Sequence, residues 1–138
     1  MPPSPLAPPA RPRVLVVDDT AALRLLIRIN LELDGFDVVE AVDGQDALDQ
    51  LASCPDDDLP DVVTLDVVMP RLDGFSAAAR MRETPRTRHL PLVIVTTQAG
   101  PSGAARAAQI GVDGYVTKPF DPETLTEAVH AAMSRRSG

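Results

Sequence analysis

Four short apolar runs, each followed at once by a polar residue, constrain the fold of this 138-residue chain more than any other feature. Runs of this length, rich in β-branched residues, are typical of buried strands. If the strands are parallel neighbours, their carboxyl ends meet at one edge of one sheet, where the polar residues would converge. The runs and the residues after them are Val14–Val17 with Asp18 and Asp19, Val62–Leu65 with Asp66, Leu92–Val95 with Thr96, and Tyr115–Thr117 with Lys118.

Helical patterns alternate with the strands along the chain. The expected strands are Arg13–Val17, Phe36–Glu40, Asp61–Leu65, Leu92–Val95 and Gly114–Thr117. One intervening helix is expected to start at Gly103 with Ser102 as its cap. Five strand–helix units predict an α/β fold, a doubly wound parallel sheet with helices on both faces. The expected domain is residues 13–134, between a disordered proline-rich tail, 1–12, and a short tail, 135–138.

Composition narrows the classes of function. A formal charge of −7 argues against nucleic acid as a direct partner, because such binding neutralises phosphates with Lys and Arg. No apolar stretch approaches the ~20 residues needed to span a membrane. The single cysteine, Cys54, excludes an intramolecular disulfide and fits a reducing, cytoplasmic setting. Five arginines between residues 71 and 88 predict a solvated basic face, and neither histidine has a ligand-spaced companion.

The strand-end carboxylates predict a metal-dependent phosphoryl site. Asp18 and Asp19 would also suit simple helix capping, but Asp66 on a second strand end adds a third acid. Carboxylates about 5 Å apart repel by roughly 3 kcal/mol, so a fold that keeps three is expected to bind a cation. An all-oxygen set suits Mg²⁺, and a screened carboxylate can attack phosphorus. Lys118 and a threonine hydroxyl would balance the charge of the phosphoryl group.

The segments VLVVDDT, DVVTLDVVMPRLDG, LPLVIVTT and GVDGYVTKPF occur in this order. With their spacing, the chain from Arg13 to Met133 resembles the receiver domain of bacterial two-component response regulators. The resemblance implies a flavodoxin-like fold with strand order 2-1-3-4-5. It also implies that Asp66 is the phosphoacceptor and that Asp18 and Asp19, with the backbone carbonyl of Val68, bind Mg²⁺.

The same resemblance assigns further roles. Thr96 matches the hydroxyl residue that contacts the phosphoryl group, Lys118 matches the lysine paired with it, and Tyr115 matches the aromatic rotamer switch. From the residues alone, the favoured interpretation of Tyr115 is a half-buried core tyrosine with its hydroxyl at the surface, and the resemblance reverses that preference. Thr97 stands where the family usually has Ala or Gly, which narrows access to the site. Val68 offers the attacking water no hydrogen bond, which predicts slow loss of phosphate, partly offset by Gln98.

The leading hypothesis is a stand-alone signalling switch, not an enzyme with an external substrate. A histidine kinase or a histidine phosphotransfer protein would phosphorylate Asp66, and the face of the fourth helix, fifth strand and fifth helix would then change for a downstream protein. The chain would be a monomer or a phosphorylation-dependent dimer. Three alternatives remain: a Mg²⁺-dependent phosphohydrolase with an aspartyl phosphate intermediate, a receiver domain cut from a longer regulator, and a disfavoured unphosphorylated pseudo-receiver.

Overall fold

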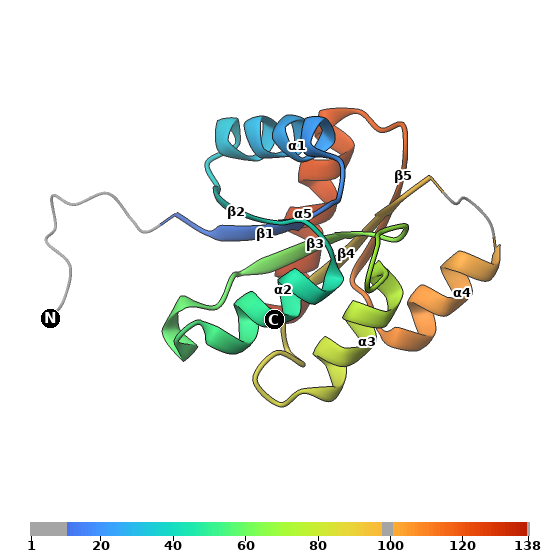
Figure 1. The fold of residues 1–138 in the computed structure, drawn as a ribbon. Helices are drawn as coiled ribbons and strands as arrows, with labels where there is room; N and C mark the ends of the chain where they lie inside the picture. The colour runs from blue at the N-terminus through green and yellow to red at the C-terminus, as the bar shows by residue number, and fades with distance from the viewer. Residues whose placement is uncertain (1–10, 98–100, 138) are drawn as a thin grey trace, which may run out of the picture.

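The computed structural model describes residues 11–97 and 101–137. The described residues contain five strands: β1 (Arg13–Val17), β2 (Asp37–Ala41), β3 (Val62–Asp66), β4 (Leu92–Thr96) and β5 (Gly114–Thr117). They also contain α1 (Ala21–Leu33), α2 (Gly44–Ser53), the 3-10 turn η1 (Asp56–Asp58), α3 (Gly74–Glu83), α4 (Pro101–Ile110) and α5 (Pro122–Ser137). Strand and helix alternate along the chain, as Figure 1 shows.

All five strands are parallel and form one sheet in the order β2-β1-β3-β4-β5. The predicted α/β, doubly wound, flavodoxin-like fold is therefore confirmed. The order reverses at β1 and β3, since β1 connects outward to β2 while β3 leads to β4 and β5 on the other side. A doubly wound sheet binds ligands beyond its carboxyl edge at such a reversal, so the topology directs attention to the ends of β1 and β3.

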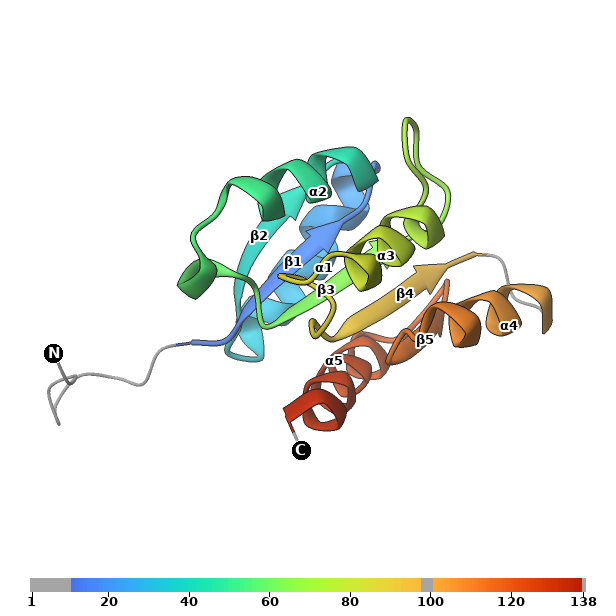
Figure 2. The same cartoon turned by 90° about the horizontal axis from the view of Figure 1, so that it is seen from below.

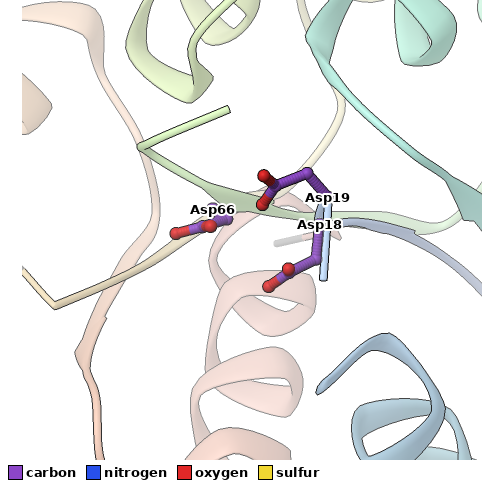
Figure 3. Close-up of side chains that lie close together, drawn as sticks. All are labelled: Asp18, Asp19 and Asp66. Carbon is purple, nitrogen blue, oxygen red and sulfur yellow. The ribbon is translucent and has the colours of Figure 1, made fainter. Parts of the chain in front are cut away.

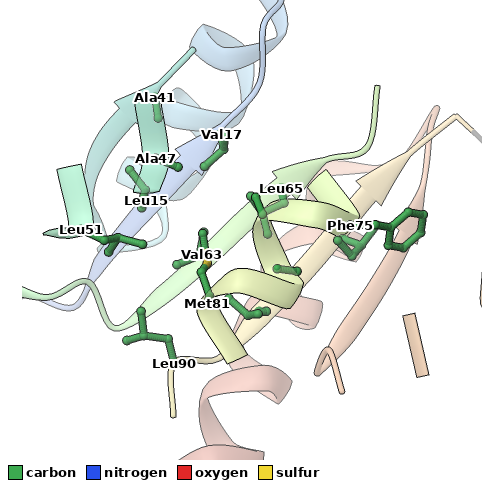
Figure 4. Close-up of a cluster of buried hydrophobic side chains, with 14 of the residues drawn as sticks. Leu15, Val17, Ala41, Ala47, Leu51, Val63, Leu65, Phe75, Met81 and Leu90 are labelled. Carbon is green, nitrogen blue, oxygen red and sulfur yellow. The ribbon is translucent and has the colours of Figure 1, made fainter. Parts of the chain in front are cut away.

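Helices cover both faces of the sheet (Figures 1 and 2). α2, α3 and α4 pack on one face, where Leu15, Leu65, Phe75 and Met81 belong to one buried cluster (Figure 4). α1 and α5 pack on the other face around a second, mostly aliphatic cluster, which includes Phe36. Burial of one such side chain contributes roughly 1.5–3 kcal/mol, so the two clusters fix the sheet as a rigid platform for its carboxyl edge.

All five strands have limits within one residue of the predicted ones. α4 begins at Pro101 and not at Gly103, since proline fits the first turn of a helix, where its missing N–H is not needed. α5 continues to Ser137, so residues 135–137 are helical where a tail was expected. The predicted N-terminal tail, 1–12, lies outside the described residues except for its last two. None of the helices within 11–97 and 101–137 is long and apolar enough to cross a bilayer.

Candidate functional site

Three acidic side chains meet at the carboxyl edge of the sheet (Figure 3). Val17 pairs with Leu65 across β1 and β3, so the residues that follow them, Asp18 and Asp66, are level with each other. Asp18, Asp19 and Asp66 each place one carboxylate oxygen within 4.8 Å of the others. The alignment of parallel strand ends predicts that these acids converge, and the structure brings all three together.

The turn after β1 holds the first two acids in different surroundings. Asp18 is buried, and its Oδ1 accepts a 2.8 Å hydrogen bond from the amide of Thr20. The amide of Asp18 donates to the carbonyl oxygen of Ala41 at the end of β2. Asp19 is exposed. The pair therefore supplies one fixed carboxylate and one that faces solvent.

Lys118 joins the acids from the end of β5. Its Nζ lies 3.3 Å from Asp18 Oδ2 and 3.3 Å from Asp66 Oδ1, and its side chain is 14% exposed. The amide of Lys118 donates to the carbonyl oxygen of Thr96, and its peptide bond to Pro119 is cis. One ammonium group thus lies between two carboxylates from different strands.

Asp66 is a carboxylate whose surroundings oppose ionisation. Burial raises its pKa, and the negative charge of Asp18 raises it further, while Lys118 and the amide of Val67 act in the opposite direction. The net shift is upward. Carboxyl groups with a raised pKa are common at functional sites. A cation bound beside such a group would stabilise its charged form.

The donor set fits Mg²⁺. Three carboxylates and one ammonium leave two negative charges in excess, and every candidate ligand atom is oxygen. Hard oxygen donors in small number suit Mg²⁺, which keeps several waters and takes phosphate oxygens as further ligands. Among the described residues, these three acids form the candidate metal cluster, with neither His nor Cys in it. The acids therefore match the chemistry predicted for them.

The loop between β3 and α3 lies directly beside Asp66. Val68, the predicted source of a carbonyl ligand, is in this loop, and the residue is 58% exposed. The amide of Gly74 donates to the carbonyl oxygen of Val67, and a Cβ on Gly74 would overlap with the carbonyl oxygen of Asp66. α3 can approach the strand end this closely only because its first residue is glycine.

The remaining predicted residues lie near the same edge. Thr96 is the last residue of β4 and is fully buried, while Thr97 is exposed. Tyr115 is half-buried on β5, level with Ile94 of β4, and packs against the cluster under α2, α3 and α4. Gln98 lies outside the described residues. The roles assigned to these side chains stay predictions.

Sequence reasoning missed the partners of two arginines in the segments around the acids. Arg24 of α1 binds Glu40 and the backbone of Asp18. Arg71, in the loop after β3, forms a two-hydrogen-bond pair with Asp43. The partners are 16 and 28 residues apart in sequence, so no local spacing pattern reveals them.

The basic stretch was predicted to be solvated, and this is wrong for two of its members. Arg82 is 13% exposed and pairs with Asp113, and Arg86 donates to Asp56 and to two carbonyl oxygens at the end of α2. Arginine in such places satisfies carbonyl groups that a loop or helix end leaves without partners. These two side chains are structural.

Comparison with known proteins agrees with this geometry. Residues 14–130 match the family model described as "Response regulator receiver domain". The Response regulator MprA of Mycolicibacterium vanbaalenii is 40% identical over 123 residues, covering 89% of this chain and 51% of the relative. A solved putative response regulator from Chloroflexus aurantiacus superposes with a TM-score of 0.83 at 30% identity, covering 91% of this chain and all of that one.

Two further relatives have names that state different functions. The chemotaxis protein CheY4 of Vibrio cholerae has a TM-score of 0.79 at 30% identity, over 88% of this chain and 98% of that one. RpaA of Synechocystis, named a DNA-binding transcriptional regulator, is 37% identical over 90% of this chain and 50% of its own length. The chain spans about half the length of these curated regulators. Its predicted lack of nucleic-acid binding stays a prediction.

Proposed function

We propose, since the chain belongs to the response regulator receiver domain family, that it receives a phosphoryl group on Asp66 from a histidine kinase or a histidine phosphotransfer protein. The observation that supports this most directly is the meeting of Asp66 with Lys118, Asp18 and Asp19 at one sheet edge. Family membership gives phosphorylation-switched signalling in general. Asp66 as the acceptor, and a histidine kinase or a histidine phosphotransfer protein as the donor, are what we propose.

Asp66 is the nucleophile in this proposal. A carboxylate oxygen attacks phosphorus, the bond from phosphorus to the donor's histidine nitrogen breaks, and that nitrogen keeps the electron pair. Because the other ring nitrogen of the phosphohistidine carries a proton, the imidazole leaves as a neutral group, and the other product is an aspartyl phosphate. The amide of Val67 donates a 2.9 Å hydrogen bond to Asp66 Oδ1, which holds the carboxylate in one orientation for attack.

Lys118 and the acids of β1 provide the electrostatics. Lys118 contacts Asp18 and Asp66 at equal distances, so its ammonium can follow the charge as this charge moves onto the phosphoryl oxygens. Asp18, Asp19 and Asp66, with the carbonyl of Val68, are the residues proposed to hold Mg²⁺. When bound, Mg²⁺ neutralises phosphoryl oxygens and orients the group for in-line transfer.

Thr96 and Tyr115 carry the response in this proposal. Thr96, buried at the end of β4, turns its hydroxyl toward the phosphoryl oxygens, and Tyr115 on the neighbouring strand moves inward. A groove lined by Tyr115, Pro119 and Phe120 lies beside this pair and changes shape with it. The altered face of α4, β5 and α5 then binds a downstream protein, which is a shift between two conformations driven by local charge.

Acetyl phosphate with Mg²⁺ tests the proposal without any knowledge of the cognate kinase. Intact-mass measurement should show one phosphoryl group per chain that alkali and hydroxylamine remove, absent in Asp66→Asn and absent when Mg²⁺ is chelated. An undiminished adduct in Asp66→Asn would refute the assignment. Release of more than one equivalent of product from p-nitrophenyl phosphate would favour the phosphohydrolase alternative.

A further inference from the structure

Two arginine–carboxylate pairs tie two segments of the candidate metal site to one place in the fold, the β2–α2 corner, residues 40–44. One segment is the turn after β1, which carries Asp18 and Asp19, and the other is the loop that follows Asp66 at the end of β3. We propose that Arg24 and Arg71 are positioning residues for Mg²⁺: they hold the turn after β1 and the loop after β3 against this corner. The inference rests on the proposed function, because it assumes that the acids at this edge bind Mg²⁺.

Arg24 holds the turn that contains Asp18. Its Nη1 donates to the carbonyl oxygen of Asp18 at 2.8 Å, and its Nε donates to Glu40 Oε1 at 2.9 Å. Arg28 holds the other oxygen of Glu40 at 2.7 Å, which fixes that carboxylate for Arg24. The amide of Asp18 meanwhile donates to Ala41. Both peptide groups that flank the Asp18 side chain are therefore anchored through the end of β2.

Arg71 holds the loop after β3 from the same corner. Its Nε and Nη2 bind the two oxygens of Asp43 at 2.8 and 3.0 Å, and the Asp43 side chain is 6% exposed. Arg71 has φ of 65°, a conformation that a non-glycine residue adopts at some cost, so the pair holds a strained backbone in place. Next to it, the amide of Gly44 donates to the carbonyl oxygen of Leu72. The loop is thus fixed by side chain and backbone together.

Positioning matters here because the ligands come from separate segments that repel each other. Mg²⁺ demands near-octahedral geometry at about 2.0–2.1 Å, so small displacements of a ligand weaken binding. In the metal-free chain the carboxylates of Asp18, Asp19 and Asp66 repel one another, and Lys118, which contacts Asp18 and Asp66, offsets only part of this repulsion. The remainder acts to separate the two segments. Attachment of both segments to one rigid corner opposes that movement and preserves a site of the right size. Outer partners of this kind are typically worth about 10–100-fold in metal affinity.

Mg²⁺ affinity, measured by calorimetric titration, tests the inference directly. Arg24→Met and Arg71→Met should each weaken Mg²⁺ binding by about 10-fold or more. Arg86→Met is the matched control, because Arg86 also joins a carboxylate, Asp56, to backbone carbonyls, but at the far end of α2. It should lower stability in urea and leave Mg²⁺ affinity within about twofold.

Arg71→Gly and Arg71→Lys separate positioning from turn formation. Glycine adopts φ of 65° without strain, so Arg71→Gly keeps the turn and loses only the pair with Asp43. Its Mg²⁺ affinity should therefore be reduced as much as that of Arg71→Met. Arg71→Lys should recover part of the affinity. The Arg71 side chain is 57% exposed, so these variants are expected to fold.

Wild-type affinity in Arg24→Met and Arg71→Met, or an equal loss in Arg86→Met, would overturn the inference and leave the proposed function standing. A wild-type chain that binds no Mg²⁺ and takes no phosphoryl group would overturn both.

Discussion

At the scale of single residues, Asp66 shows a conflict between stability and chemistry. Its pKa is raised by burial and by the charge of Asp18. A carboxyl group with a raised folded-state pKa favours folding fully only below its unfolded-state pKa, about 3.9, where it is neutral. That contribution is lost as the pH rises through the folded-state pKa. Above its folded-state pKa, the ionised Asp66 therefore destabilises the metal-free fold.

Asp66→Asn should consequently stabilise the metal-free protein at pH 7. The expected gain is about 1 kcal/mol, or about 4 °C in melting temperature, because the amide keeps its shape and loses its charge. Thermal unfolding in chelator across pH checks this. The gain should vanish below about pH 4, where the wild-type carboxyl is neutral. A variant less stable than wild type at pH 7 would show that the ion pair with Lys118 outweighs the burial of charge.

Val68 is expected to set how long the phosphoryl group lasts. Its exposed apolar side chain borders the site and gives an attacking water no hydrogen bond. Val68→Asn should shorten the phosphorylated lifetime by about 10-fold, which corresponds to about 1.4 kcal/mol, the worth of one good hydrogen bond. Decay of the intact-mass adduct measures the lifetime, with Val68→Leu as control. A variant that loses phosphate no faster than wild type would remove this role.

At the scale of elements, the local sequence pattern predicts the strands of this molecule, because a buried strand is apolar along its own length. β3 and β4 are buried at every position, so their apolar runs need no knowledge of the partner strands. The strand-end acids are predictable for the same reason, since parallel strands align their ends. The ion pairs of Arg24 and Arg71 could not be predicted in this way. Each arginine meets its carboxylate only in the folded chain, and no regular sequence spacing marks the pair.

α1 has a second apolar face that the fold leaves exposed. Leu25, Leu26, Ile29 and Leu33 are each 46% or more exposed, on a helix that begins two residues after Asp19. A helix that is apolar on both its inner and outer sides is usually covered on both. If a protein phosphodonor reaches Asp66 as proposed, it approaches the edge where α1 begins, and we expect it to contact the outer face of α1.

A Leu25→Gln/Ile29→Gln variant should separate the two kinds of phosphodonor. Both side chains are exposed, so stability should change by no more than about 0.5 kcal/mol, and phosphorylation by acetyl phosphate should be unaffected. Phosphotransfer from the cognate kinase should fall by about 10-fold, because lost apolar contact weakens docking. Val39→Thr, an exposed valine on the edge strand β2, is the control. An equal fall with both donors would place the effect on Asp66 chemistry.

At the scale of the whole molecule, one ion-pair network joins the two helical layers at the edge opposite the site. The buried carboxylate of Asp113 binds Arg82 of α3 at 2.9 Å and Arg136 of α5 at 2.8 Å. It also accepts from the amide of Leu92 at the start of β4. Both arginines donate to the carbonyl oxygen of Gly111 as well. α3 and α5 lie on different faces of the sheet, so the contacts of Asp113 attach both helices to the amino-terminal edge of the sheet.

The two ends of the sheet should therefore respond independently to mutation. Arg82→Met should lower the free energy of unfolding by about 3 kcal/mol, because it leaves the Asp113 carboxylate buried with one partner fewer. Arg136→Met should cost less, since that side chain is 32% exposed against 13% for Arg82. Urea unfolding measures both. Mg²⁺ affinity and the Asp66 adduct should stay at wild-type levels, because the network lies at the far ends of the strands that carry the acids. A loss of Mg²⁺ binding in Arg82→Met would instead mean that the edges are coupled through the sheet, and that the site depends on how tightly α3 and α5 are fastened.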